Sequence, residues 1–342
     1  SIMIDINPYL EQYNDEIKLD VTKETNLRKS RDAVKDTIIR YFENNNKNKP
    51  SFKGQGSFTM KTTINPKDTN DEYDIDYGVY LNCDDIIPEE KQDAKSEWVK
   101  PETVHGWIYD AVENQTSQKP ENKNKCVRVK YGPGENTYSY HIDLPIYVEY
   151  QEKYYLAIKN DNEWVESNPR AIIDWFRNEV KEKGEDYRII VRFLKSWSKL
   201  QSWNCKKPTG LVLTVLASEQ YTTVTYDEGI YDLKLLDTVK NIIDYLDKQI
   251  KKNKYELYNP IANDENLFKD YSQAAITELK EKLVNFNDNL DSALEAETTD
   301  DAFRHLRKCF KDIEDLDIDN QNENNYIKTS APAILGNDGR SA

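Results

Sequence analysis

The spacing of apolar residues divides the chain into a mixed first half and a helical second half. Residues 22–46 form one apolar stripe at helical spacing, which predicts a long amphipathic helix, and residues 98–113 read as a second helix. From Asn168, placed as a helix N-cap before Pro169, the helical period continues to about residue 315. The pattern therefore predicts an α+β core followed by an all-helical lobe.

The strands of the first half carry acidic residues on one side. Residues 73–81, YDIDYGVYL, alternate so that Ile75 points inward while Asp74 and Asp76 point outward. CVRVKY and TYSYHIDLPIYVEY, separated by the turn GPGEN, predict a β-hairpin whose second arm turns Asp143 away from the core. A further strand is expected at Ile64 or just before it, and we interpret His141 as structural, on the face opposite Asp143.

Two aspartates on one strand face need a compensating charge. Asp is disfavoured in strands, and side chains at i and i+2 share a face with Cα atoms about 7 Å apart. Like charges at that spacing repel unless a positive group lies between them, and the simplest such group is a divalent metal ion. Asp74 and Asp76 are therefore candidate metal ligands.

A turn of small residues, Gly54-Gln55-Gly56-Ser57, lies just upstream of these aspartates. Its backbone N–H groups and hydroxyl are suited to holding a phosphate. Carboxylates on two neighbouring strands are suited to two Mg²⁺ ions, which prefer oxygen ligands, and Mn²⁺ is an alternative. The combination indicates two-metal phosphoryl transfer.

Composition and charge narrow the class of protein. The 342 residues are 37% hydrophobic and 32% charged, which supports a real core under a heavily charged surface. A net charge of −15 argues against a protein that coats long nucleic acid, because phosphate neutralisation requires a large Lys and Arg surface. The four cysteines form no C-x-x-C pair and are interpreted as reduced, mostly buried thiols. Without a signal peptide or a membrane-spanning apolar run, we expect a cytoplasmic location.

These motifs resemble one known family. GQGSF followed by DEYDIDYGVYL, with a third Asp on a later strand, resembles the DNA polymerase β-like nucleotidyltransferases and, more closely, the bacterial cGAS/DncV-like nucleotidyltransferases. LRKSRDAVKDTIIRYF looks like the spine helix of that family, while RFLKSW, PTGLVLTVLA and NDENL resemble its helical lobe. The similarity covers roughly residues 20–315 in order and spacing.

The resemblance implies a two-lobed fold with the active site in the cleft between the lobes. Residues 1–165 would form the nucleotidyltransferase core with its mixed sheet and spine helix. Residues 166–316 would form a helical lobe similar to that of oligoadenylate synthetase. Residues 317–342 are polar, and we expect them to be a flexible tail.

The resemblance also assigns roles to individual residues. Asp74, Asp76 and Asp143 would be catalytic and would hold two Mg²⁺ ions, with Asp143 nearest the attacking hydroxyl. Eight further residues would bind nucleotide: Gln55, Gly56, Ser57, Lys195, Thr209, Arg128, Lys130 and Asp264. Gln55, Gly56 and Ser57 would hold the donor triphosphate, and Lys195 would reach its phosphates. Arg128 and Lys130 would contact the second nucleotide.

The implied activity is synthesis of a cyclic di- or trinucleotide messenger from nucleoside triphosphates, ATP or GTP above all, in antiviral defence against phage. In many operons of this family a ubiquitin-transfer-like partner captures the synthase C-terminus, and the tail would suit that use. Two alternatives stay open. One is a transferase with a linear product, such as an oligoadenylate-like or nucleotidylyl-modifying enzyme. The other is a catalytically silent nucleotide-binding scaffold that acts through its tail.

Overall fold

The chain divides into two units in the computed structural model, which describes residues 3–67, 71–133, 138–315 and 327–328. Residues 19–174 form one unit, here called the sheet unit. Residues 1–18 and 175–342 form the other, here called the helical unit. The division falls inside helix α5 (Pro169–Lys183), which Asn168 caps by accepting a hydrogen bond from the backbone N–H of Ala171, as predicted.

A mixed sheet of eight strands forms the sheet unit. Its order is β4–β5–β6–β3–β7–β8–β9, with β2 paired to β3. The strands are β2 (Ser51–Gln55), β3 (Tyr73–Leu81), β4 (Glu121–Asn122), β5 (Val127–Tyr131), β6 (Tyr140–Leu144), β7 (Ile146–Tyr150), β8 (Lys153–Ile158) and β9 (Glu163–Glu166). Central strand β3 runs parallel to β6 along its first half and to β7 along its second half.

The strand predictions are confirmed at 73–81 and in the β5–β6 hairpin. The strand expected near Ile64 is wrong, because the strand lies earlier, at Ser51–Gln55, and is followed directly by the short helix α3 (Gly56–Met60).

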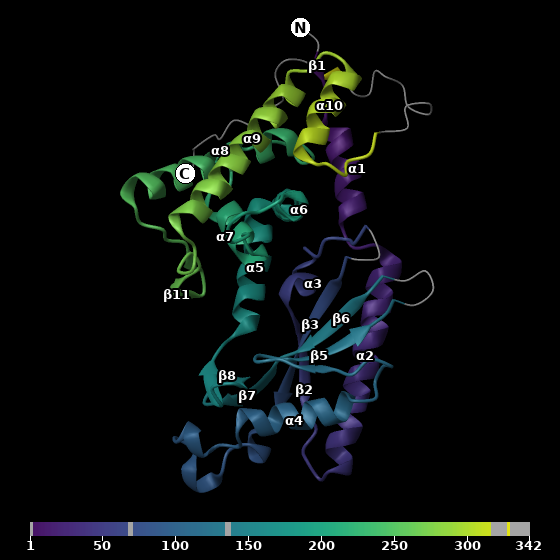
Figure 1. Cartoon of the computed structure of the whole chain (residues 1–342), viewed down its shortest axis with the longest axis vertical. Helices are drawn as coiled ribbons and strands as arrows, with labels where there is room; N and C mark the ends of the chain where they lie inside the picture. Colours follow the sequence, from purple (N-terminus) through teal and green to yellow (C-terminus); the bar gives the residue numbers. More distant parts are fainter. Residues whose placement is uncertain (1–2, 68–70, 134–137, 316–326, 329–342) are drawn as a thin grey trace, which may run out of the picture. The chain divides into compact units, whose positions relative to one another are not determined.

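Two helices cover one side of this sheet (Figure 1). Helix α2 (Val21–Asn44) begins where the Asp20 side chain accepts a hydrogen bond from the backbone N–H of Lys23, at 2.9 Å. Its buried stripe packs with α4 (Pro101–Val112) on the apolar face of the strands. That core includes Leu27, Val34, Ile38, Phe42, Val104, Ile108, Ile75, Val79, Val127, Val129, Ile142 and Leu144. Short 3-10 helices at Cys83–Asp85, Glu89–Lys91 and Lys95–Glu97 precede α4. The opposite face of the strands is left for polar side chains.

The helical unit begins at the N-terminus. Its elements are α1 (Asn7–Ile17), α6 (Glu185–Leu200), α7 (Gly210–Glu219), α8 (Tyr231–Lys252), α9 (Gln273–Leu294), α10 (Thr299–Cys309) and the hairpin β10 (Tyr258–Asn259) to β11 (Ala262–Asn266). Helix α1 packs against α6 and α8, and the Tyr13 hydroxyl makes 2.6 Å hydrogen bonds with Ser196 and Asp312.

The expected domain limits differ from these units at the N-terminus. Residues 1–18 group with the helices, because α1 buries its apolar side there, although we expected them in a core spanning 1–165. Of the tail expected at 317–342, the structure describes Ile327–Lys328 (β12), which pairs antiparallel with β1 (Met3–Ile4). The rest of that tail lies outside the described residues, so its predicted flexibility stays a prediction.

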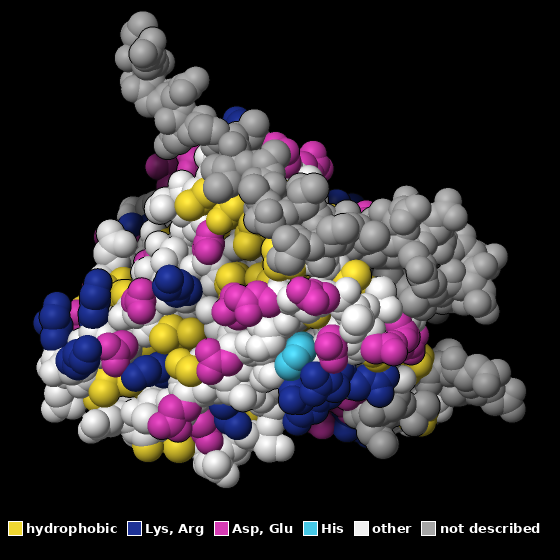
Figure 2. Space-filling view, turned by 90° about the horizontal axis from the view of Figure 1, so that it is seen from above, with side chains coloured by type: hydrophobic (Ala, Val, Ile, Leu, Met, Phe, Trp, Pro, Cys, Tyr) yellow, Lys and Arg dark blue, Asp and Glu magenta, His cyan; other side chains and the backbone are white. Residues whose placement is uncertain are grey.

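The surface carries charges of both signs. Figure 2 shows Lys and Arg side chains interspersed with Asp and Glu over one face of the molecule. All four cysteines are free, but Cys83 is exposed and only Cys309 is buried, so the expectation of mostly buried thiols is wrong. None of the helices in the described ranges is long and apolar enough to cross a membrane.

Replacing a buried side chain of helix α2 by alanine should destabilise the sheet unit. Ile38 has no exposed surface, so Ile38→Ala is expected to lower the free energy of unfolding by about 2–5 kcal/mol. Arg40→Ala, on the exposed side of the same helix, should change it by less than about 0.5 kcal/mol. Urea unfolding followed by tryptophan fluorescence measures both, and equal effects would contradict the packing described here.

Candidate active site

Strand register gathers polar side chains on the face of the sheet opposite the core. Asp74 lies opposite His141, and Asp76 opposite Asp143, in the parallel pairing of β3 with β6. On the other side of β6, Arg128 lies opposite Asp143 and Lys130 opposite His141 in β5. Since alternate residues of a strand share a face, the six side chains point to one side. The three aspartates expected to act together therefore lie on adjacent strands.

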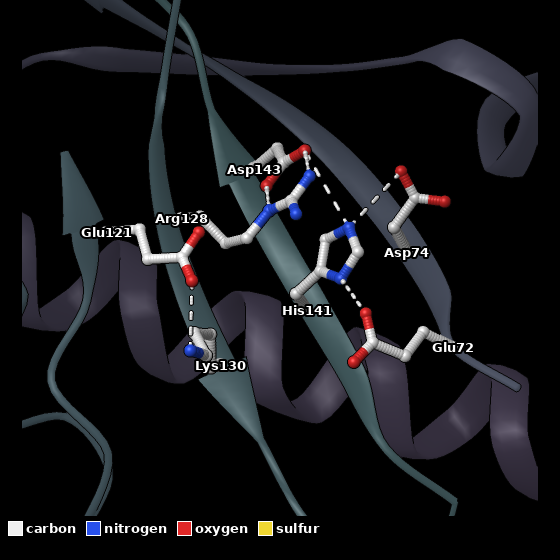
Figure 3. Close-up of polar contacts among 7 residues, drawn as sticks. All are labelled: Glu72, Asp74, Glu121, Arg128, Lys130, His141 and Asp143. Carbon is white, nitrogen blue, oxygen red and sulfur yellow. Dashed lines mark hydrogen bonds and ion pairs between the residues drawn. The ribbon is translucent and has the colours of Figure 1, made fainter. Parts of the chain in front are cut away.

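Arg128 engages Asp143 at both carboxylate oxygens. Its Nε donates to Oδ1 at 2.8 Å and its Nη2 donates to Oδ2 at 2.9 Å (Figure 3). This hydrogen bonding raises the pKa of Arg128 above its usual value. The pair is largely buried, with side-chain exposures of 23% for Arg128 and 11% for Asp143. A bidentate pair of this kind fixes the carboxylate in orientation as well as charge.

His141 lies among three carboxylates, which the sequence analysis missed. Its Nε2 is 3.7 Å from Asp74 Oδ2 and 3.8 Å from Asp143 Oδ2, and its Nδ1 is 3.6 Å from Glu72 Oε2 (Figure 3). The expectation that His141 points away from Asp143 is wrong, because residues two apart on a strand share a face. Counting that alternation correctly would have placed His141 in the site.

Asp74, His141 and Asp143 together can hold a divalent cation. One ligand atom from each lies within 4.8 Å of the other two. Two carboxylates and an imidazole are a donor set that proteins use for divalent metals. The residues present therefore fit the metal that phosphoryl transfer requires.

Asp76 stands beside this trio and is crowded by like charge. Burial, followed by the charges of Asp74 and Asp143, raises the pKa of Asp76 to about 7. Its carboxylate lies against Gly56, where an added Cβ would come within 2.2 Å of Oδ2. Gly56 also has φ of +72°, a conformation that favours glycine. The loop backbone can therefore approach this carboxylate only because residue 56 has no side chain.

The predicted phosphate turn lies at the junction of β2 and α3. Gln55 ends β2 opposite Asp76, and its Nε2 donates to the Tyr147 hydroxyl at 3.1 Å. Its Oε1 is buried and has no hydrogen-bond partner among the described residues. The Ser57 hydroxyl pairs with that of Thr63 at 3.0 Å. The turn is thus next to the carboxylates, as the sequence predicts.

The remaining predicted nucleotide contacts have the following surroundings. The Lys130 ammonium, on β5, forms an ion pair with Glu121 of the neighbouring strand β4 at 2.9 Å. Lys195, Thr209 and Asp264 belong to the helical unit. Thr209 caps α7 by accepting from the backbone N–H of Val212, and the Lys195 ammonium is 3.7 Å from the position of a Cβ at Gly210. Asp264 is exposed on β11, and the roles predicted for these residues stay predictions.

Removing the charge of Asp76 should change how stability depends on pH in metal-free protein. A carboxyl pKa raised to about 7 means that folding favours the protonated form, so stability falls as pH rises from about 4 to 7. Asp76→Asn cannot ionise, and at pH 8 it should be more stable than wild type by up to about 4 kcal/mol. The difference should vanish near pH 4.

Urea unfolding in a chelator buffer at both pH values measures this effect. Asp161→Asn, at an exposed position of the same unit, is the matched control and should follow wild type. If the free energy of unfolding depends on pH in the same way for wild type and Asp76→Asn, the raised pKa of Asp76 is contradicted.

Known proteins resemble this chain in sequence. Residues 50–147 match the family described as "Cyclic GMP-AMP synthase DncV-like, nucleotidyltransferase domain". A cyclic GMP-AMP synthase of Escherichia albertii is 34% identical over 174 residues, which are 48% of this chain and 36% of that relative. The match thus spans about a third of that relative's length. A cyclic GMP-AMP synthase of Vibrio cholerae is 25% identical over 315 residues, covering 76% of this chain and 67% of the relative.

Solved structures share the fold. Vibrio cholerae DncV cyclic AMP-GMP synthase, in complex with the linear intermediate 5′ pppA(3′,5′)pG, aligns with a TM-score of 0.73 at 18% identity. The alignment covers 97% of this chain and all of that chain. These alignments confirm the predicted fold class, an α+β fold of the polymerase β-like type in which helices follow the sheet. With the family match, the resemblance stated from the motifs is confirmed as well: residues 50–147 match the nucleotidyltransferase domain of the DncV-like family.

Proposed function

We propose that this chain is a divalent-metal-dependent nucleotidyltransferase that joins ribonucleoside triphosphates into a cyclic di- or trinucleotide. The observation that supports this most is the meeting of Asp74, Asp76 and Asp143 on adjacent strands, next to the turn at Gly56. The names of the relatives support a cyclic GMP-AMP product. A second solved Vibrio cholerae structure holds ATP and GTP, which supports these substrates.

The reaction exchanges one phosphorus–oxygen bond for another. A 3′- or 2′-hydroxyl oxygen of one nucleotide attacks the α-phosphorus of the next, and the bond from that phosphorus to the bridging oxygen breaks. Pyrophosphate leaves with the bonding electron pair, and the hydroxyl proton passes to Asp143. Because Arg128 holds both oxygens of Asp143, it fixes the direction in which that carboxylate faces the hydroxyl.

The metal ions, two Mg²⁺ in this proposal, would be held by Asp74, Asp76 and Asp143. When bound they lower the pKa of the attacking hydroxyl and offset the triphosphate charge. Their positive charge would also favour the ionised form of Asp76, whose pKa burial raises to about 7, and would thereby make this carboxylate available as a ligand.

The chain's other polar groups would position the nucleotides. Backbone N–H groups of Gly56 and Ser57 would hold the donor phosphates with Gln55. Lys195, Thr209 and Asp264 would contact nucleotide from the helical unit. Lys130 would help Arg128 to hold the second nucleotide by charge.

The proposed setting is antiviral signalling in the cytoplasm, where the product would activate an effector during phage infection. The C-terminal residues 317–342 would be the substrate of a ubiquitin-transfer-like partner. Both points depend on the family resemblance of the motifs.

Neutralising either β3 aspartate should abolish turnover without unfolding the protein. Asp74→Asn and Asp76→Asn each remove one ligand from a like-charge cluster, and we expect pyrophosphate release from ATP and GTP to fall at least about 100-fold. Melting temperatures should stay at or above that of wild type. Asp161→Asn is the control for loss of an exposed acidic charge. Release at the wild-type rate by either variant would refute the site assignment.

The product distinguishes cyclic from linear synthesis. A cyclic product has no terminal phosphate, so phosphatase treatment of a reaction with radiolabelled ATP and GTP should leave a labelled nucleotide on thin-layer chromatography. Loss of all labelled product to phosphatase would favour a linear transferase. Failure to consume ATP, GTP, CTP or UTP would favour a silent scaffold.

A further inference from the structure

Both ring nitrogens of His141 face carboxylates, as is common for histidines that bind metals. One ring nitrogen, Nε2, faces Asp74 and Asp143, and the other, Nδ1, faces Glu72 (Figure 3). Histidines that bind metals commonly direct their second nitrogen to a carboxylate, which fixes the ring and strengthens the ligand. Glu72 Oε2 is 3.6 Å from Nδ1, which is longer than an N–H···O hydrogen bond, so Glu72 would have to come slightly closer to orient the ring in this way.

The distances suit ligands of a shared ion better than hydrogen bonds. The separations of 3.7 and 3.8 Å exceed the range of N–H···O hydrogen bonds. Metal–ligand bonds of about 2.0–2.2 Å put two ligands of one ion up to roughly 4 Å apart. Asp143 keeps capacity for an ion while it is paired with Arg128, because a carboxylate offers about four lone-pair sites. The nitrogen and the two carboxylates can therefore share one cation.

A small cavity borders one side of the His141 ring. It has a volume of about 130 Å³, and Glu72, His141, Arg128 and Lys130 are among its lining residues. Asp74 and Asp143 are not among its lining residues, so the cavity gives solvent access to the Glu72 side of the ring and not to the ion position itself.

We propose that His141 Nε2 is a metal ligand at this site, oriented by Glu72, and that the nitrogen gives the site a preference for a first-row transition ion such as Mn²⁺ over Mg²⁺. Imidazole suits first-row ions such as Fe²⁺ and Zn²⁺ best, and Mn²⁺, the weakest binder of that series, accepts a nitrogen ligand more readily than Mg²⁺, which prefers oxygen ligands alone. The inference rests on the proposed function in one respect, that this face binds the reaction's metal. It adds a ligand and a metal preference that three aspartates alone would not provide.

The other histidines offer a clean background for a test. The chain has three in all. Both ring nitrogens of His105 have partners, Asn122 Oδ1 at 2.9 Å and the Ala157 carbonyl at 3.0 Å. His305 lies on α10 in the helical unit. A signal from imidazole bound to metal can therefore be assigned by single substitutions.

The test uses the full chain loaded with Mn²⁺ in the absence of nucleotide. Electron spin echo envelope modulation of bound Mn²⁺ should show a coordinated ¹⁴N in wild type. His141→Gln should lose it, while His305→Gln should keep it. Titrations followed by the electron paramagnetic resonance signal of free Mn²⁺ give the Mn²⁺ affinity, and competition with Mg²⁺ gives the Mg²⁺ affinity. His141→Gln should lower the Mn²⁺ affinity at least about 10-fold and the Mg²⁺ affinity by less than about 3-fold.

The variant Glu72→Gln tests the orienting role of Glu72 separately from metal binding by His141. It should keep the ¹⁴N signal and weaken Mn²⁺ binding about 10-fold, because the ring loses its carboxylate partner. Bound Mn²⁺ without ¹⁴N modulation in wild type would overturn the proposal, and so would equal losses of Mn²⁺ and Mg²⁺ affinity in His141→Gln. These readings need no turnover. An inactive protein that shows the nitrogen signal would therefore refute the proposed function alone, and an active protein without it would refute only this inference.

Discussion

Repulsion among carboxylates held on one sheet face is the constraint on which this site depends. Strand pairing brings Asp76 next to Asp143, and burial together with the neighbouring charges raises the free energy of the ionised form of Asp76. The protein offsets part of this cost with Arg128, which neutralises Asp143, and part through the raised pKa of Asp76, about 7, which leaves that carboxyl partly protonated at neutral pH. A bound cation would add to the compensation by Arg128 and replace the proton on Asp76, so the energetic cost of the cluster is also the source of its affinity for metal.

The opposite face of the same strands explains why such crowding is tolerated. Ile75 and Ile142 alternate with the aspartates and pack under α2 and α4. Burial of that apolar layer stabilises the pairing of β3 with β6 independently of the charges. Because the two faces share one backbone, the core holds the acidic residues in place, and the site does not need to be stable by itself.

Periodicity in the sequence predicted the parts that follow local rules. The alternation in residues 73–81 placed Asp74 and Asp76 on one face, and the stripe of Leu27 and Ile38 predicted the spine helix. The bidentate partner of Arg128 could not be predicted, because it depends on the register of β5 against β6, which local alternation leaves undetermined. The grouping of residues 1–18 with the helices also depends on tertiary packing. The position of His141 in the site was predictable, because residues two apart on a strand share a face and His141 lies two residues from Asp143.

The pairing register has a consequence for how this protein can change over time. A slip of one residue between β3 and β6 would turn Ile142 out to solvent and drive Asp143 into the apolar layer. Evolutionary drift toward a new spacing of the acidic positions would therefore pass through unfolded intermediates. Selection for stability alone would keep the strand register in descendants, including any that had lost the reaction, but it would not keep the aspartates themselves.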